Sequence, residues 1–402
     1  MRACGLIVEY NPFHNGHQFH LEKSKIKSES DCMIAVMSGN FLQRGEPAII
    51  DKFHRARIAI QQGVDIVVEL PFAYAVQHSD LFAKGAILTL GAMGVEAICF
   101  GSEHGETDNF TKAVHTYLSE QETYKEALKD ALSNGLSFPQ ASTEAYKKIG
   151  LTEGQIDLSK PNNILGFSYV KSIVETNQKI KPYTIKRYKN NYHDKSIRDP
   201  IASATSIREA LFSDNDLPML NQTMPNETIQ TLAHYRREAG IWHQWETYFP
   251  LIQYRVMTMT AKELSSIHGI GEGLENRLKK TATKATSFQS WVEAIKTKRY
   301  TWTRIQRVMT HILVNSKKET IQHITESHSI SHIRLLGMSR RGQEYLNRIK
   351  KHIHVPIVTS LGKDSSLLEM DERAADAYYS VLAPQQRIKL RSQEIKAPYM
   401  GR

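Results

Sequence analysis

Two histidines near the amino terminus are spaced to act together on a phosphate group. The segment His14-Asn15-Gly16-His17 ends an apolar run and opens a stretch with helical periodicity. Gly16 permits a tight turn that leaves room above the backbone, and the free N–H groups at the start of a helix attract an anion. Two imidazoles can also donate to phosphate oxygens as charge builds during attack on an α-phosphorus. The segment therefore predicts a nucleotide site in which His14 and His17 are catalytic.

Two other interpretations of this segment stay open at the level of sequence. His14, His17 and His20 offer nitrogen ligands for a metal ion, although no cysteine or acidic cluster lies nearby. They also fit ordinary surface histidines. A second segment favours the phosphate interpretation, because residues 202–208 (Ala-Ser-Ala-Thr-Ser-Ile-Arg) begin a helix after a loop, with Ser203 and Thr205 as candidate N-caps.

Apolar runs of strand length alternate with helix-length segments over the first half of the chain. The runs lie at residues 5–8, 32–37, 66–70, 97–100 and 183–188, and the last alternates like an edge strand. Nearly continuous apolar strands are buried on both faces, as in a parallel sheet covered by helices. The pattern predicts an α/β fold with a Rossmann-like doubly wound parallel sheet, followed by a mainly helical basic C-terminal region.

The loops that follow three of these runs are rich in glycine, histidine, serine and asparagine. They are residues 9–17, 38–47 and 101–105. Ligands of such sheets bind at the carboxyl ends of the strands. The loops therefore predict one polar site at one rim of the sheet.

The net charge of +10 is carried entirely by the second half of the chain. Residues 1–210 contain 24 basic and 24 acidic side chains, whereas residues 211–402 contain 28 and 18. A regional surplus of this kind indicates a surface for a polyanion joined to an electrically neutral module. A soluble basic domain without such a partner is the alternative.

Beyond Phe212 the sequence pattern becomes mostly helical, and the polar stretch 213–218 predicts a domain boundary. We therefore expect a catalytic domain over residues 1–212 and a mainly α-helical, polyanion-binding region over residues 213–402. A small strand–helix–strand appendage is expected within residues 330–402.

Basic and aromatic side chains are interleaved over residues 296–307, which suits phosphate contacts and stacking of an unpaired base. An amphipathic helix with a basic outer face is the alternative. Residues 267–274 resemble a helix-hairpin-helix turn, for which a purely structural turn is the alternative, and residues 337–341 begin a basic helix. The side chains predicted to contact a polynucleotide are Lys279, Lys280, Lys298, Arg299, Tyr300, Trp302, Arg304, Arg307, Arg340 and Arg341.

Five segments together resemble the bacterial tRNA(Met) cytidine acetate ligase family, which shares its His-x-Gly-His signature with nucleotidylyltransferases and class I aminoacyl-tRNA synthetases. They are residues 5–17, 37–47, 101–105, 160–166 and 298–304, so the resemblance covers essentially the whole chain. It implies a two-step reaction. ATP and acetate give acetyl-adenylate and diphosphate, and the acetyl group then passes to N4 of the wobble cytidine of elongator tRNA(Met), forming N4-acetylcytidine.

The same resemblance implies the residues that hold ATP. The Ser-x-Thr-x-Ile-Arg element of nucleotidylyltransferases, which closes over the β- and γ-phosphates, is similar to residues 203–208. On the residues alone, Asn162 also fits a helix N-cap and Arg187 an exposed strand residue. The implied ATP-binding residues are Ile7, Val8, Glu9, Tyr10, Asn11, Pro12, Phe13, His14, Asn15, Gly16, His17, Gln18, Phe19, His20, Gly101, Asn162, Arg187, Ser203 and Thr205.

Acetate needs hydrogen-bond donors close to the reacting phosphate. The polar loop after the second apolar run offers Ser38, Gly39, Asn40, Gln43 and Arg44, and a flexible surface loop is the alternative. Mg²⁺ is expected to arrive with ATP, because the sequence shows no dedicated carboxylate cage and no resident metal site.

Two other functions remain open: transfer of AMP to a small phosphorylated metabolite, and ATP sensing by a non-catalytic RNA-binding protein. No apolar stretch approaches the roughly 20 residues of a membrane span, and the amino terminus is a core strand rather than a signal peptide. Cys4, Cys32 and Cys99 lie in or beside apolar runs, which indicates reduced core thiols and a cytoplasmic protein without a membrane partner. The sequence carries no prediction of oligomeric state.

Overall fold

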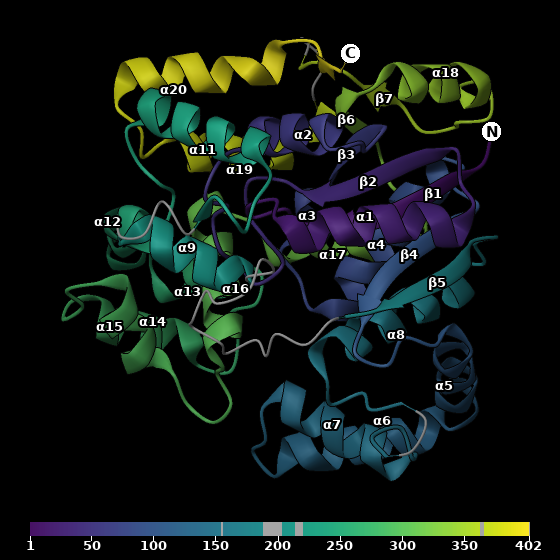
Figure 1. Ribbon diagram of the computed structural model, residues 1–402. Coiled ribbons are helices and arrows are strands. Elements are labelled where there is room, and N and C mark those ends of the chain that lie inside the picture. The colour runs from purple at the N-terminus through teal and green to yellow at the C-terminus, as the bar shows by residue number, and fades with distance from the viewer. Residues whose placement is uncertain (154–155, 188–202, 214–219, 362–365, 402) are drawn as a thin grey trace.

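Residues 1–153, 156–187, 203–213, 220–361 and 366–401 are described in the computed structural model of the chain (Figure 1). At their centre is one eight-stranded sheet with the strand order β5-β4-β1-β2-β3-β6-β7, in which β8 pairs with β6. The strands are β1 (Ala3–Val8), β2 (Cys32–Ser38), β3 (Ile66–Leu70), β4 (Ala97–Ser102), β5 (Lys181–Lys186), β6 (Ile333–Met338), β7 (Ile357–Val358) and β8 (Tyr399–Met400).

Each of the five apolar runs predicted as strands forms one, and these five strands pair in parallel. β2 and β3 are buried along their whole length, which explains their uninterrupted apolar sequence. β5, whose sequence alternates, lies at the edge of the sheet. The predicted α/β class with a doubly wound parallel sheet is therefore confirmed.

Helices cover both faces of the sheet. Side chains of β1 and β2 alternate between the two layers, so that Leu6 and Met33 face α1 and α2, whereas Ile34 and Val36 face α4 and α8. The helices of this part are α1 (Asn15–Ser28), α2 (Lys52–Gln61), α3 (Phe72–Ala75), α4 (Ser79–Ala92), α5 (Thr107–Ser119), α6 (Gln121–Ser133), α7 (Phe138–Lys148), α8 (Pro161–Glu175) and α9 (Ala204–Phe212).

The second half is mainly helical, as predicted, and it shares a hydrophobic core with the sheet. The Phe41 ring, in the loop after β2, lies 6.1 Å from that of Tyr248 and 5.9 Å from that of Tyr378. No helix in the described part of the chain combines the length and the hydropathy that a membrane crossing requires. The elements are α11 (Asn226–Ala239), α12 (Trp245–Thr258), α13 (Ala261–Ser265), α14 (Leu274–Ala282), α15 (Phe288–Ile295), α16 (Trp302–Val314), α17 (Lys318–Glu326), α18 (Arg340–Ile349), η1 (Ser366–Leu368), α19 (Glu369–Tyr379), α20 (Pro384–Arg391) and η2 (Ser392–Ile395).

The strand–helix–strand unit expected within residues 330–402 is present as β6, α18 and β7, but it is not an appendage. β6 pairs antiparallel with β3 and extends the main sheet. Pairing covers the open, apolar edge of β3, which would otherwise expose unpaired backbone groups. Ser339 strengthens the junction, because its hydroxyl donates to the Asp65 carboxylate at 2.8 Å. Of the predicted linker at residues 213–218, only Ser213 is among the described residues.

Candidate active site

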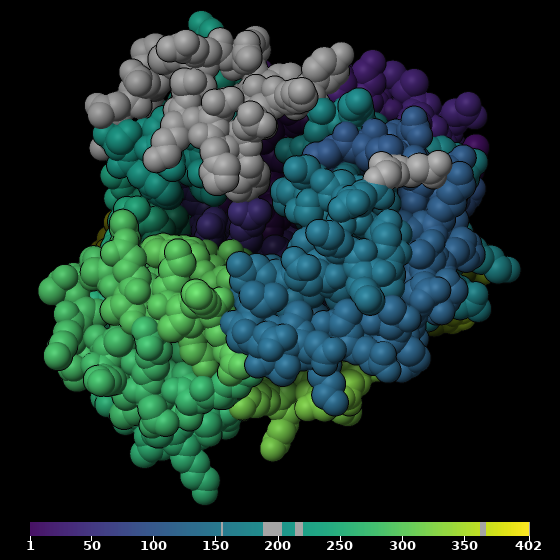
Figure 2. Space-filling view, turned by 90° about the horizontal axis from the view of Figure 1, so that it is seen from below, coloured from purple at the N-terminus to yellow at the C-terminus, as the bar shows by residue number. Residues whose placement is uncertain are grey.

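The face of the molecule shown in Figure 2 is hollowed. Blue residues, which include the α5–α7 segment, form one wall of the hollow, and teal and green residues from the middle of the chain form another. Purple residues from the amino-terminal part of the chain form its floor. The turn after β1, which contains the predicted catalytic histidines, belongs to this amino-terminal part.

His14 and His17 are held by reciprocal contacts at the start of α1. Nδ1 of His14 accepts the Gly16 N–H at 3.0 Å, and Nδ1 of His17 accepts the His14 N–H at 3.3 Å. The two rings stack, with centroids 3.8 Å apart. Because both Nδ1 atoms accept, the proton of each neutral ring is on Nε2. The turn therefore presents two adjacent Nε2–H donors.

These rings are neutral at pH 7. Burial lowers the pKa of His14 to about 3, helped by the nearby charges of Arg187 and Arg208. Burial also lowers the pKa of His17 well below its usual range and that of His20 to about 4. In the described part of the chain, none of the three belongs to a group of side chains spaced for a metal ion. The geometry favours the phosphate interpretation over the metal interpretation and over surface histidines.

Gly101, Asn162 and Arg187, far apart in sequence, meet beside β4. The Arg187 guanidinium donates to Oδ1 of Asn162 at 3.2 Å, and Nδ2 of Asn162 donates to Glu103 at 2.7 Å. A Cβ on Gly101 would lie 3.2 Å from the Arg187 side chain, so the absence of one leaves room there. The N-cap of α8 is Lys160 and not Asn162, so the helix-cap interpretation of Asn162 is wrong.

Helix α9 docks onto the histidine turn through Arg208. Its guanidinium donates to the Asn11 carbonyl at 2.9 Å and pairs with Glu46 at 3.4 Å. Ser203 caps the helix by accepting the Ser206 N–H at 3.1 Å, as predicted, and Thr205 is partly exposed. Arg208 was absent from the predicted site residues, although the last position of the 202–208 segment was the signal that could have identified it.

Other residues of the 7–20 segment build the turn itself. The rings of Tyr10 and Phe13 are buried with centroids 4.7 Å apart. Oδ1 of Asn11 accepts the Ile49 N–H at 2.8 Å, and Nδ2 of Asn15 donates to the Gln222 carbonyl at 2.8 Å. These contacts hold the backbone of the turn against the loops around it.

The loop after β2 is fixed in place and is not a flexible surface loop. Oδ1 of Asn40 accepts the Lys52 N–H at 2.9 Å, and Nε2 of Gln43 donates to the Gln77 carbonyl at 2.8 Å. The backbone N–H of Gln43 donates to the Glu9 carboxylate at 2.8 Å. Burial raises the pKa of that carboxyl group.

Arg55 of α2, which is not among the predicted site residues, ties the ends of β1 and β2 together. It is fully buried, and its guanidinium donates to the carbonyls of Glu9 (2.6 Å), Ser38 (3.1 Å) and Gly39. Arg55 is one of two arginines in α2, which also contains Lys52 and His54, so its residue type and spacing give no sequence signal for such a role.

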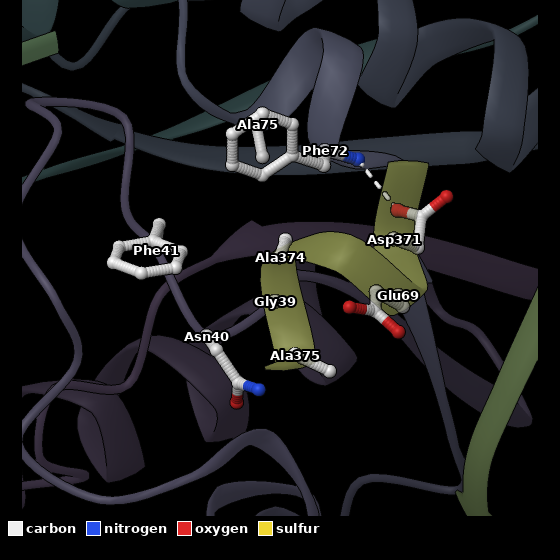
Figure 3. Close-up of a pocket in the computed structure, with 9 residues that line it drawn as sticks. All are labelled: Gly39, Asn40, Phe41, Glu69, Phe72, Ala75, Asp371, Ala374 and Ala375. Atoms are coloured by element: carbon white, nitrogen blue, oxygen red, sulfur yellow. Dashed lines mark hydrogen bonds between the residues drawn. The ribbon is translucent and has the colours of Figure 1, made fainter. Parts of the chain in front are cut away.

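A cavity of about 10 Å³ lies under the first residues of this loop (Figure 3). A volume of this size holds one water molecule and is too small for acetate. The first three residues of the predicted acetate pocket are buried and hold the loop in place; they are Ser38, Gly39 and Asn40. The other two, Gln43 and Arg44, are partly exposed. The lining residues, labelled in the figure, are Gly39, Asn40, Phe41, Glu69, Phe72, Ala75, Asp371, Ala374 and Ala375.

The loop also abuts helix α16 of the second half. A Cβ on Gly45 would lie 2.5 Å from the backbone nitrogen of Arg307, and the Thr310 hydroxyl donates to the Gly45 carbonyl at 2.6 Å. Burial lowers the pKa of Arg307 to about 10, and the charges of Arg304 and Arg44 contribute. Three guanidinium groups therefore gather where the loop meets the helical region.

Several side chains predicted to contact a polynucleotide have structural roles instead. Tyr300 is 7% exposed and donates to the Glu272 carbonyl at 3.0 Å, so its ring cannot stack on a base. Trp302 is partly buried against the core. Nζ of Lys279 donates to the last carbonyls of α12, including that of Val256 at 3.2 Å. Both aromatic rings fill space between helices, which the short basic–aromatic pattern could not reveal.

Arg340 and Arg341 lie at the opposite rim of the sheet. The Arg341 guanidinium donates to the Asp31 carbonyl at 3.4 Å, just before β2 begins, whereas His14 follows the carboxyl end of β1. They therefore lie away from the rim that holds the histidine turn, and their predicted contact with a polynucleotide stays a prediction. Lys280, Lys298 and Arg299 are exposed, and Arg304 lies over the Tyr300 ring at 4.9 Å.

Comparisons with known proteins agree with this geometry. A model of the HIGH nucleotidyl transferase family matches residues 1–394. The tRNA(Met) cytidine acetate ligase of Oceanobacillus iheyensis is 54% identical over 400 residues, which cover 99% of each chain. That of Bacillus subtilis is 44% identical over 382 residues, which cover 94% of this chain and 92% of its own. A crystal structure of Thermotoga maritima TmcAL bound with alpha-thio ATP aligns over 100% of both chains, with a TM-score of 0.90 and 32% identity. The chain therefore belongs to the tRNA(Met) cytidine acetate ligase family of HIGH nucleotidyl transferases.

Proposed function

We propose that this chain activates acetate with ATP and transfers the acetyl group to N4 of the wobble cytidine of elongator tRNA(Met). The products are N4-acetylcytidine in the tRNA, AMP and diphosphate. The observation that carries the proposal is the stacked pair His14 and His17, two neutral Nε2–H donors near Arg187 and Arg208. Such a group of donors suits a polyphosphate. The names of the relatives support acetate and tRNA(Met) as the other substrates.

In the first step, a carboxylate oxygen of acetate attacks the α-phosphorus of ATP, and the bond to the diphosphate oxygen breaks. His14 and His17 donate hydrogen bonds to the phosphate oxygens as charge develops on them. Arg187 and Arg208 stabilise the charge on the departing diphosphate. Because the donors are neutral rings, the step consumes no proton, and the product is acetyl-adenylate.

In the second step, N4 of cytidine attacks the acetyl carbonyl carbon, the bond to the AMP oxygen breaks, and N4 loses a proton. The lone pair of N4 is delocalised into the ring, so the amine needs a good leaving group and close positioning. Covalent catalysis by cysteine does not fit, because burial raises the pKa of Cys4 to about 12 and that of Cys99 to about 11.

Mg²⁺ enters with ATP in this proposal. In the part of the chain that the structure describes, no set of carboxylates beside His14 is spaced for a metal ion. The ion would be held mainly by the ATP phosphates and water and would neutralise part of the phosphate charge, as is usual for Mg²⁺.

Acetate lies against the partly exposed portion of the loop after β2. Gln43 and Arg44 are the members of the predicted pocket that reach it, whereas Ser38, Gly39 and Asn40 support them from below. The Arg44 guanidinium attracts the acetate carboxylate. It lies close enough to Arg307 for its charge to lower the pKa of Arg307, as does the charge of Arg304.

The tRNA approaches over α16. Exposed Lys298 and Arg299 stand before this helix, and Arg304 and Arg307 lie along it toward the loop after β2. Guanidinium groups gathered there favour an RNA phosphate next to the cytidine. The path joins the basic second half to the nucleotide site.

The decisive experiment is incubation with ATP, isotopically labelled acetate and total tRNA, followed by nucleoside analysis. We expect the label in N4-acetylcytidine, and label absent from cytidine would overturn the proposal. Acetate-dependent release of diphosphate would exclude a non-catalytic ATP sensor. Salt-sensitive tRNA binding would exclude AMP transfer to a small metabolite, which needs no basic second half.

A further inference from the structure

A cluster of two histidines and a glutamate lies on the outside of the sheet domain, where α11 crosses α2. His54 belongs to α2, and His234 and Glu238 lie one turn apart on α11. Nε2 of His234 is 3.3 Å from one Glu238 carboxylate oxygen, and Nε2 of His54 is 4.0 Å from the other. The three ligand atoms all lie within 4.8 Å of one another.

These distances suit a tetrahedral metal ion. Zn²⁺ binds nitrogen and oxygen at about 2.0–2.2 Å, so neighbouring ligand atoms in its shell are about 3.3–3.6 Å apart. The separation of 3.3 Å between His234 and its nearest Glu238 oxygen is in that range, and the separation of 4.0 Å between His54 and the other oxygen is just above it. Two imidazoles and one carboxylate form a ligand set typical of Zn²⁺ with an open fourth position.

The imidazole of His54 is already oriented for this role. The Asp51 carboxylate is fully buried and accepts Nδ1–H of His54 at 2.8 Å and its backbone N–H at 2.9 Å. Gln393 donates to the other oxygen of Asp51 at 3.0 Å. Since a carboxylate only accepts, His54 carries a proton on Nδ1, and Nε2, on the side of Glu238, is the ring atom that can bind a metal ion. A carboxylate behind a metal-binding histidine is the usual supporting arrangement.

In this structure, a lysine ammonium group pairs with the carboxylate of the cluster. Nζ of Lys389, on α20, lies 2.8 Å from the Glu238 oxygen that also faces His234. The Lys389 side chain is 66% exposed, so it can turn into water when a metal ion binds. His234 is 49% exposed, which leaves an entry path and room for a water ligand.

We propose that His54, His234 and Glu238 bind one Zn²⁺ ion, with water as the fourth ligand. The ion links α11 of the helical region to α2, the helix whose Arg55 ties β1 to β2. The site is separate from the nucleotide-binding turn, and its role is to stabilise the junction between the two halves of the chain.

The test uses the untagged full-length protein after treatment with EDTA. We expect one equivalent of Zn²⁺ to bind in competition with a chromophoric chelator and to raise the melting temperature. The His234→Ala variant should weaken this affinity at least tenfold. The matched control is His352→Ala, an exposed histidine outside the cluster, which should bind Zn²⁺ like the parent protein.

The Lys389→Ala variant distinguishes a metal-binding site from a network of ion pairs that binds no metal. Removal of the competing ammonium should tighten Zn²⁺ binding, whereas loss of an ion pair alone would lower the melting temperature and leave Zn²⁺ affinity unchanged. Failure of the parent protein to bind one equivalent, or equal binding by His234→Ala, would overturn the proposal. Acetate-dependent diphosphate release by the parent protein is measured alongside, because it reports on the nucleotide site alone.

Discussion

At the scale of single residues, the chemistry at the nucleotide turn depends on which ring nitrogen carries the proton. The Gly16 N–H donates to Nδ1 of His14, and the His14 N–H donates to Nδ1 of His17. Burial keeps both rings neutral. In each histidine, Nδ1 therefore has a structural role, and Nε2–H is the group that can donate to substrate. A substitution that keeps the acceptor but removes the Nε2–H donor can distinguish the two roles.

His14→Asn keeps a side-chain acceptor for the Gly16 N–H and removes the Nε2–H donor. We expect acetate-dependent ATP–diphosphate exchange to fall by about 100-fold or more, as when an oxyanion donor is removed. The free energy of unfolding should change by less than about 1 kcal/mol, because asparagine is a good N-cap. His14→Ala loses the cap as well and should be less stable. Normal exchange by His14→Asn would mean that the ring only caps the helix.

The same burial predicts how stability depends on pH. The pKa of His14 is lowered to about 3, whereas the unfolded side chain takes up a proton below about 6.5. Lowering the pH through that window favours the unfolded chain, so this contribution to stability is present above about pH 6.5 and is lost as the pH falls. The slope approaches about 1.4 kcal/mol per pH unit for one such group. Urea unfolding between pH 7 and 5 should show a shallower dependence for His14→Asn than for the parent protein.

At the scale of elements, buried polar anchors fix the loops that carry the site. Arg55 holds three carbonyls at the ends of β1 and β2 and is fully buried. Arg55→Ala removes the buried donors of these carbonyls and opens a cavity, so we expect a loss of about 3 kcal/mol or more in urea unfolding. Arg57→Ala is the matched control, because Arg57 is exposed and lies over the Tyr399 ring. It should cost less than about 1 kcal/mol. Equal losses for the two variants would contradict the anchoring role.

The parts of the fold that the sequence could predict are those that local patterning determines. The five parallel strands follow from apolar runs such as 66–70, and the histidine turn from its glycine and spacing. The place of β6 could not be predicted, because its pairing with β3 joins segments more than 250 residues apart and depends on which edge remains open. The burial of Tyr300 depends on helix packing in the same way. The place of Arg208 in the site likewise depends on the packing of α9 against the histidine turn, which no local pattern predicts.

At the scale of the whole molecule, two halves with different charge share one core and face one hollow (Figure 2). The neutral half holds the nucleotide turn, and the basic half meets it where Gly45 touches α16. Gly45 has φ +88 and no room for a Cβ against the Arg307 backbone. Gly45→Ala should therefore separate the loop from α16 and slow acetyl transfer to tRNA more than adenylate formation. Single-turnover transfer from preformed acetyl-adenylate measures the difference, and equal loss in both steps would argue against a bridging role.

The position of the basic side chains makes the tRNA surface testable by ionic strength. Lys298 and Arg299 are exposed before α16, whereas Arg340 and Arg341 lie at the opposite rim of the sheet. Each lost phosphate contact lowers the slope of log affinity against log salt by roughly one. Lys298→Ala with Arg299→Ala should therefore weaken tRNA binding and reduce the slope by about two, without changing acetate-dependent ATP–diphosphate exchange. Arg340→Ala with Arg341→Ala removes the same charge and should leave both the affinity and the slope unchanged. If the second pair had the same effect as the first, tRNA would be responding to net charge alone and not to a surface beside the nucleotide site.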